Sequence, residues 1–319
     1  MNKRTTALSL GITLLVLLAG TVGGSFYMLK YALSPENRGK DMAGSLTYME
    51  EMYPQITPWV DSLQNAHALR DTFITAPDGT RLHAFYARAS RPRKETAVIV
   101  HGYTDNAIRM FHIGYMYNRS LDYNILLPDL RYSGLSGGNA LQMGWLDRKD
   151  VMQWIDTAPA LFGDSIEAVV HGISMGAATT MMLSGEQLPA YVRCFVEDCG
   201  YTSVWEQFSK ELKERFGLPP FPLLYTASWL CQWKNGWNFH EASAEKQIAR
   251  CHKPMLFIHG DKDDFVPTWM VYEVYKAKPD PKALWIVPNA GHATSYLLYP
   301  EEYTQRVKRF VEDNLNDRP

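Results

Sequence analysis

The sequence contains few cysteines and almost no net charge. Four cysteines occur among 319 residues, and none is spaced like the ligands of a structural zinc site. The 32 basic and 34 acidic residues leave a formal charge of −2. A balance of this kind favours neither a nucleic acid nor an acidic polymer as partner. Internal repeats and low-complexity tracts are also missing, which argues against a repeat protein. A chain of this length with 46% apolar residues is long enough for one large, well-filled domain.

Charged residues are missing altogether from the mostly apolar run 7–29, which follows Lys3 and Arg4. A helix of this length crosses about 30 Å of hydrocarbon at 1.5 Å per residue. Basic residues before the run favour a cytoplasmic N-terminus. We therefore expect a membrane anchor over residues 1–30 and a catalytic body outside the cytoplasm. The alternative is a cleaved signal peptide and a secreted protein, although signal peptides have a shorter apolar core of about 7–15 residues.

The four cysteines could form disulfides in such an oxidising compartment. Four cysteines allow three pairings, and the sequence leaves all of them open. Cys194 and Cys251 both precede strands that we expect to be neighbours, so we favour this pair.

The region after the apolar run divides into a connector and a hairpin. Residues 31–70 have the pattern of a juxtamembrane helical connector. Two alternating runs, Thr72–Thr75 and Leu82–Ala87, follow it and are joined by Pro77–Thr80, whose residues suit a tight turn. We expect an antiparallel hairpin here.

Short apolar runs separated by segments of helical length make up most of the remaining chain. Runs that are apolar on both faces indicate strands covered by helices on both sides, and therefore a mostly parallel, doubly wound α/β sheet. The six runs are Ala97–Val100, Asn124–Leu127, Ala168–Val170, Phe195–Val196, Met255–Ile258 and Leu284–Val287. Residues 201–250 break this rhythm with aromatic-rich helical segments, which we interpret as a helical insertion between two strands.

A serine lies in a G-x-S-x-G pentapeptide between an apolar strand and a helix start of small residues. Gly172 and Gly176 flank Ser174, and glycine removes the Cβ atoms that would collide at a sharp strand-to-helix turn. Such a turn presents the serine hydroxyl at the carboxyl edge of the sheet, at a helix N-terminus whose dipole favours developing negative charge. The pattern predicts Ser174 as a nucleophile.

With this elbow the chain resembles the α/β-hydrolase superfamily from about residue 72 to its C-terminus. Among these proteins it is most similar to the single-domain esterases and peptidase-like hydrolases that carry a cap between the sixth and seventh strands. The resemblance implies an α/β-hydrolase domain over residues 71–319, with the helical cap inserted at about 201–250. It also implies an acid and then a histidine downstream of the serine.

The acid is expected in the loop His259–Pro267, which follows a predicted strand. This loop resembles the superfamily's HG-x-x-D-x-x-V-P motif, with Asp263 at the acid position. Asp261 and Asp264 are close enough in sequence to compete for the same role.

The base is expected at His292, in the loop Asn289–Ala293 after the last predicted strand. The superfamily usually carries its histidine in this place. Because serine is a poor nucleophile until a positioned base takes its proton, Ser174, Asp263 and His292 are predicted to form a catalytic triad. We assign structural roles to the other histidines, His259 among them.

The segment His101–Asn106 matches the superfamily's first oxyanion loop. The backbone N–H groups of Tyr103 and Met175 are therefore predicted to bind the oxyanion of a tetrahedral intermediate. A Tyr103 side chain that faces the substrate is the alternative. The segment Asp129–Ser136 resembles the superfamily's D-x-R-x-x-G-x-S turn and is expected to brace these loops.

These residues predict hydrolysis of a carboxylic ester through an acyl-enzyme, with thioester or peptide cleavage by the same route as alternatives. We expect a small-molecule or peptide acyl substrate, no metal and no organic cofactor. The second class of function is a non-catalytic α/β-hydrolase-like binding protein, against which the complete set of site residues argues. Because the triad lies wholly downstream of the apolar run, a chain beginning near Ser34 is predicted to be soluble and active.

Overall fold

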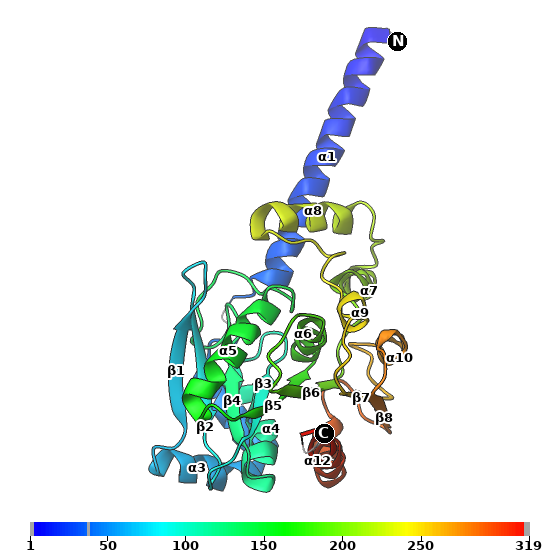
Figure 1. Cartoon of the computed structure of the whole chain (residues 1–319). Coiled ribbons are helices and arrows are strands. Elements are labelled where there is room, and N and C mark those ends of the chain that lie inside the picture. Colours follow the sequence, from blue (N-terminus) through cyan, green and yellow to red (C-terminus); the bar gives the residue numbers. More distant parts are fainter. Residues whose placement is uncertain (1–2, 37–38, 316–319) are drawn as a thin grey trace.

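An eight-stranded sheet forms the centre of the protein, as the computed structural model shows for residues 3–36 and 39–315 (Figure 1). The strand order is β1-β2-β4-β3-β5-β6-β7-β8. β2 pairs antiparallel with β1 and β4, and all other neighbours are parallel. The strands are β1 (Arg70–Thr75), β2 (Arg81–Ala87), β3 (Glu95–Val100), β4 (Asn124–Pro128), β5 (Glu167–Ile173), β6 (Val192–Asp198), β7 (Met255–Gly260) and β8 (Lys282–Val287). The predicted mostly parallel sheet and its hairpin are confirmed.

Helices cover both faces of this sheet. In β3, Val98 and Val100 belong to one core cluster, whereas Ala97 and Ile99 belong to the other. The strand is buried on both sides, which explains why it reads as an unbroken apolar run. The first face carries α5 (Asp147–Phe162), α6 (Met175–Ser184), α9 (Ala244–Ile248) and α10 (Trp269–Ala277). The second face carries α2 (Met42–Met52), η1 (Pro54–Ile56), α3 (Thr57–Asn65), η2 (Ala107–Met110), α4 (Phe111–Tyr115), η3 (Met116–Ser120), α11 (Ser295–Leu298) and α12 (Pro300–Leu315).

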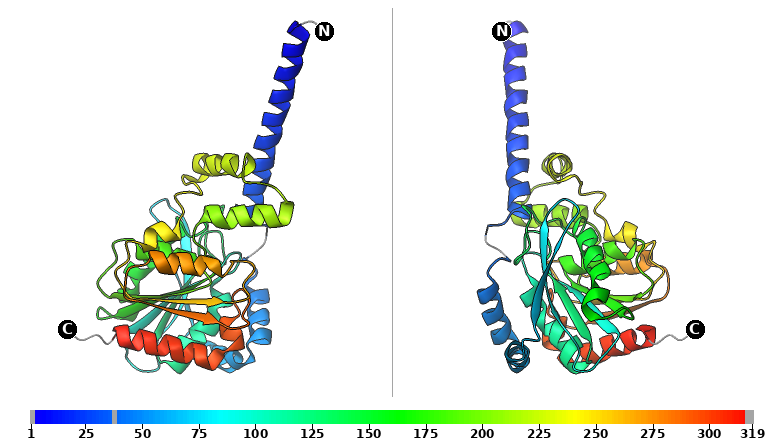
Figure 2. Two further views of the ribbon diagram at one scale, coloured as in Figure 1. Left: turned by 90° about the vertical axis from the view of Figure 1, so that its right-hand side faces the viewer. Right: turned by 60° about the vertical axis from the view of Figure 1, so that its left-hand side comes forward.

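The N-terminal helix α1 (Lys3–Leu33) projects from the folded body (Figures 1 and 2). The side chains of residues 6–20 are all exposed. Within the described residues, one helix, over residues 6–33, is long and apolar enough to cross a membrane, a test that a signal sequence would also pass. The last turns are different, because Leu29 and Leu33 are buried in the first core cluster.

The structure therefore differs from the expected division at residue 30. α1 continues unbroken to Leu33, and its final turns are part of the hydrolase core. The connector is also integral to the fold, since Ile56, Trp59 and Val60 are buried in the second cluster.

The cap between β6 and β7 consists of α7 (Val204–Phe216), α8 (Leu223–Asn235) and the short α9. α8 packs against α1 and lies across it at the end of the body from which α1 projects (Figures 1 and 2). The contact includes a hydrogen bond of 3.0 Å from the Ser25 hydroxyl to the carbonyl oxygen of Leu223.

The disulfide favoured between Cys194 and Cys251 is wrong. All four cysteines are buried free thiols. Cys194 belongs to the core cluster on one face of the sheet and Cys251 to the cluster on the other face. The sheet therefore separates the two side chains, although their strands are neighbours.

Candidate active site

Ser174 lies at a sharp turn between β5 and α6, with φ 57° and ψ −119°. A Cβ atom on Gly172 would lie 2.1 Å from the carbonyl oxygen of Gly176. A Cβ atom on Gly176 would lie 2.1 Å from the carbonyl oxygen of Val100. Both approaches are far too close for a side chain, so the pentapeptide needs glycine at these two positions. The turn brings the Ser174 hydroxyl to the carboxyl edge of the sheet.

The structure brings the three predicted site residues into one hydrogen-bonded chain. His292 Nε2 lies 2.8 Å from Ser174 Oγ, and His292 Nδ1 lies 2.7 Å from Asp263 Oδ2. A carboxylate beside Nδ1 keeps the proton on that nitrogen, which leaves Nε2 to accept from the serine hydroxyl. The three residues follow β5, β7 and β8, so the parallel strands deliver them to the same edge of the sheet.

The Asp263 carboxylate is held by its own loop as well as by histidines. Oδ1 accepts hydrogen bonds from the backbone N–H groups of Phe265 at 3.0 Å and Val266 at 2.9 Å. Burial raises the pKa of Asp263, but hydrogen bonds from His259 and His292 outweigh burial and lower the pKa to about 2. The acid is therefore ionised at neutral pH and can stabilise a protonated His292. His259 keeps the structural role that we assigned to it, with Nε2 at 3.4 Å from Asp263 Oδ2.

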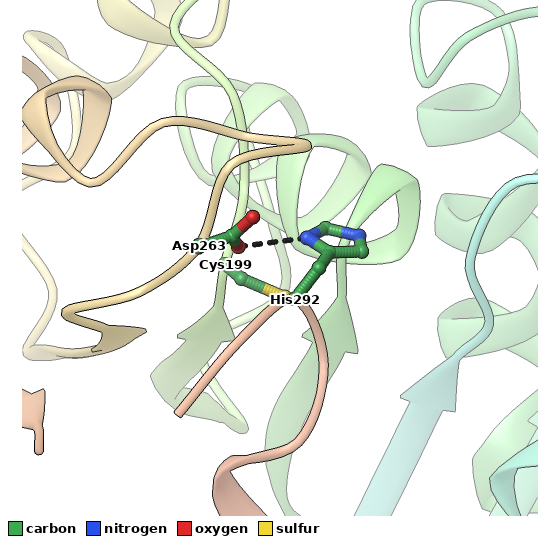
Figure 3. A group of neighbouring side chains, drawn as sticks. All are labelled: Cys199, Asp263 and His292. Carbon is green, nitrogen blue, oxygen red and sulfur yellow. Dashed lines mark hydrogen bonds and ion pairs between the residues drawn. The ribbon is translucent and has the colours of Figure 1, made fainter. Parts of the chain in front are cut away.

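Cys199 lies beside Asp263 and His292, a position that sequence reasoning missed (Figure 3). Its ligand atom and those of Asp263 and His292 lie within 4.8 Å of one another, a spacing at which a metal could be held. Both ring nitrogens of His292 are already hydrogen-bonded, one to Asp263 and the other to Ser174. We therefore interpret the three residues as the triad and its surroundings and not as a metal site. Burial raises the pKa of the Cys199 thiol well above its usual range, which keeps it protonated. The sequence did offer one signal for Cys199, because this residue directly follows β6 at the edge of the sheet that carries the triad.

The predicted oxyanion residues lie on two backbone segments beside the nucleophile. Met175 is the first residue of α6, where backbone N–H groups have no partner within the helix. A Cβ atom on Gly102 would lie 3.5 Å from the Cβ atom of Ser174, so the loop that carries Tyr103 approaches the serine closely. The Tyr103 hydroxyl donates to the carbonyl oxygen of Ala32 at 2.7 Å. This phenol therefore ties the loop to the end of α1.

The turn after β4 braces the site, as the motif suggested. Asp129 Oδ1 accepts from the N–H of Ala107 at 2.7 Å, and Oδ2 accepts from the N–H of Leu135 at 2.9 Å. The same carboxylate binds His83 Nδ1 at 2.7 Å. One buried acid thus connects the segment after the oxyanion loop, the turn itself and the hairpin.

A cavity of about 920 Å³ opens in front of Ser174 and His292. Loops of the sheet edge form its floor, and helices of the cap form one wall. The other wall is α1, which contributes residues 27–32. Sequence reasoning missed this wall, because nothing local connects the apolar run to a site far along the chain.

Comparison with known proteins agrees with this architecture. The prolyl oligopeptidase family matches residues 110–318. Uncharacterized protein YqkD of Bacillus subtilis is 30% identical over 232 residues, which cover 73% of this chain and 75% of that protein. The alpha/beta hydrolase domain-containing protein WAV2 of Arabidopsis thaliana is 24% identical over 255 residues, covering 76% and 78% of the two chains.

Two solved structures share the fold. The Pyrococcus furiosus esterase Pf2001 superposes with a TM-score of 0.64 at 22% identity, covering 80% of this chain and 96% of that one. The acylaminoacyl peptidase of Pyrococcus horikoshii has a TM-score of 0.57 at 17% identity, covering 79% of this chain and 42% of that one. The chain belongs to the prolyl oligopeptidase family of the α/β-hydrolases, and it is a hydrolase of this type.

Proposed function

We propose that the protein is a serine hydrolase that cleaves carboxylic esters through an acyl-enzyme. The observation that carries the proposal is the unbroken chain from Ser174 through His292 to Asp263, with contacts of 2.8 and 2.7 Å. A nucleophile, a base and an ionised acid in this order are what acyl transfer requires.

In the first half-reaction Ser174 Oγ attacks the carbonyl carbon of the ester while His292 Nε2 takes the hydroxyl proton. The tetrahedral oxyanion forms beside the backbone N–H groups of Tyr103 and Met175. His292 then gives its proton to the leaving alcohol, and the acyl group stays on Ser174. In the second half-reaction water loses a proton to His292 and attacks the acyl-enzyme. His292 then returns the proton to Ser174 Oγ as the acyl–oxygen bond breaks, which releases the carboxylic acid and restores the enzyme.

An ester substrate is favoured by the cavity, which several apolar side chains line. Phe208, Leu212, Leu224 and Phe239 come from the cap segment, and Phe265 comes from the loop that carries Asp263. Such a surface suits an apolar acyl group. Thioester and peptide cleavage would use the same machinery and are the competing activities, since one structural neighbour is an esterase and another a peptidase.

Membrane attachment through α1 is the second part of the proposal. The side chains of residues 6–20 are exposed, and a run without charge is stable in hydrocarbon. Lys3 and Arg4 before it favour a cytoplasmic N-terminus. The active site then lies on the extracytoplasmic side.

The catalytic proposal is tested with a fluorophosphonate probe and short-chain nitrophenyl esters. Wild-type protein should be labelled and should turn over the ester. Ser174→Ala removes the nucleophile at little steric cost, so labelling should vanish and the rate should fall by about 10⁶-fold if the triad acts as a unit. A folded wild-type protein that is not labelled at neutral pH would support the non-catalytic binding protein instead.

A further inference from the structure

α8 carries a row of exposed aromatic side chains on the face opposite its packed face. Phe221, just before the helix, is 72% exposed, and Tyr225, Trp229 and Trp233 are 52%, 65% and 71% exposed. Positions four residues apart lie on one face of a helix. We call these four residues the aromatic stripe. The other face packs on the core through Leu224, Ala227, Leu230 and Cys231. A contiguous aromatic surface of this kind marks an interaction site.

The position of α8 relative to α1 identifies the surface that covers the stripe. Ser25 is buried and bonded to Leu223, and a Cβ atom on Gly24 would lie 3.2 Å from the Leu223 side chain. A bilayer must therefore end before Ser25. The part of α1 before Ser25, residues 6–24, is about 29 Å long at 1.5 Å per residue, against about 30 Å of hydrocarbon. The span is only just long enough to cross the hydrocarbon, so the folded body cannot move away from the bilayer. α8 is therefore held against the membrane surface.

The composition of the stripe fits this position. Tryptophan and tyrosine are enriched where hydrocarbon meets headgroups, because their rings are apolar and their N–H or O–H groups reach water. α8 lies across α1 at the end of the body from which that helix projects (Figure 2). The span already places the aromatic stripe at the bilayer, so a partner protein would have to compete with lipid for this face of α8.

The mouth of the active-site cavity lies at the same level. Tyr27, Tyr31 and Phe216 line the cavity and are also 63%, 49% and 41% exposed. Tyr27 and Tyr31 lie about 4.5 and 10.5 Å beyond Gly24 along the helix axis. A headgroup layer is about 5–7 Å thick on each side of the hydrocarbon. Tyr27 therefore lies within that layer and Tyr31 just beyond it, so a molecule in the layer meets the cavity at its Tyr27 end.

We propose that α8 docks on the bilayer through the aromatic stripe and that the substrate is the acyl ester of a membrane glycerolipid. The acyl chain enters between α1 and α7, and Ser174 takes the acyl group while the lysolipid leaves as the alcohol with the proton from His292. Water then releases the fatty acid. This substrate class rests on the proposed serine esterase activity.

The test uses the full-length protein in vesicles of phosphatidylcholine, phosphatidylglycerol and diacylglycerol. Fatty acid release reports lipid hydrolysis, and a nitrophenyl butyrate added to the water reports the triad alone. Trp229→Gln/Trp233→Gln should lower lipid hydrolysis at least tenfold and leave butyrate hydrolysis within twofold of wild type. The matched control is Trp269→Gln/Tyr272→Gln, which removes two aromatics of α10 that are 48% and 49% exposed. It should leave both rates unchanged.

Brominated lipids supply a readout that does not depend on turnover. They should quench tryptophan fluorescence in the wild type, and the stripe variant should lose most of this quenching. Wild-type protein that hydrolyses the butyrate but releases no fatty acid would overturn the lipid proposal and leave the esterase standing. A stripe variant that loses both rates equally, or a wild type without quenching, would overturn the docking. If neither butyrate nor fluorophosphonate reacts, the esterase itself fails.

Discussion

Three aspartates lie within four positions of the acid loop, and their surroundings give them different tasks. Asp263 is buried against His292. Asp261 is exposed and accepts from the backbone N–H of Asn289 at 2.6 Å, which ties its loop to the histidine loop. Asp264 is exposed, and its backbone carbonyl accepts from Lys210. Of the three, only Asp263 can hold His292 in the tautomer with its proton on Nδ1.

Asp263→Asn and Asp264→Asn form a matched pair that tests this difference. The amide that Asn places at position 263 has no negative charge to hold His292 in the tautomer with its proton on Nδ1. Ester turnover should therefore fall by about 10⁴-fold. The same change at 264 should leave turnover within about twofold of wild type, because that side chain faces solvent. Steady-state rates with a soluble ester decide the matter. If Asp264→Asn lowered turnover more than Asp263→Asn, the catalytic acid would be Asp264.

Glu197 is a buried carboxyl that the mechanism does not use. Oε2 accepts from the N–H of Gly200 at 3.0 Å, and Oε1 has no hydrogen-bond partner among the described residues. Burial raises the pKa of Glu197 to about 8, and the nearby His259 and the Gly200 N–H only partly offset this effect. The folded protein therefore binds this proton more tightly than the unfolded chain does.

The sign of the pH effect follows from that difference. The stabilisation from the Glu197 proton is complete below its ordinary pKa of 4.5 and is lost as the pH rises through about 8. Glu197→Gln keeps the shape and removes the titration. The free energy of unfolding should fall less between about pH 5 and 8 in this variant than in the wild type, as measured by urea denaturation in detergent. Parallel curves for the two proteins would contradict the assignment.

At the scale of elements, α1 has two halves with different surroundings. None of the described residues before Ser25 belongs to a core cluster, whereas the half after it buries Leu29 and Leu33. Its last carbonyl groups accept from the Tyr103 hydroxyl at 2.7 Å and from the Leu141 N–H at 2.7 Å. Carbonyl groups at a helix C-terminus need such partners, and here one comes from the oxyanion loop.

Two truncated chains test the two halves of α1 separately. The contacts of the second half change the expectation that a chain beginning near Ser34 is active. A chain beginning at Val22 should keep soluble-ester activity, because the pocket wall stays in place. A chain beginning at Ser34 loses Leu29, Leu33 and that wall. Burial of the two leucines is worth about 3–6 kcal/mol, so its melting temperature and its activity should both drop sharply. Equal activity of the two chains would show that α1 is dispensable to the site.

At the scale of the whole molecule, the question is where the hydrolase sits. The chain should stay with the membrane fraction after alkaline carbonate washing, since an uncharged span gains far more from a bilayer than a peripheral contact does. In intact cells, a protease on the outer side should reach the catalytic body. Recovery in the washed supernatant would contradict the anchor. A mature N-terminus at Ser25 would indicate a cleaved signal, with export correct and the pocket wall retained.

The sequence alone determined the order of elements and the chemistry of the edge. Strand runs, the glycines around Ser174 and the loops that carry Asp263 and His292 are local patterns, because each depends on neighbours within about ten residues. The fold expected from them is confirmed, and the structure places the three side chains within hydrogen-bonding distance. Their catalytic roles stay predictions.

Only the tertiary structure decided which distant segments meet. The contact of Ala32 with Tyr103 and that of Ser25 with Leu223 join residues 71 and 198 positions apart, and no local pattern encodes such pairs. The same holds for Cys194 and Cys251, whose strand neighbours suggested a bond that the sheet prevents. The spacing of the aromatic stripe is visible in the sequence, but its outward direction is not. A helix buries whichever face its packing partners cover, and for α8 those partners are α1 and the core.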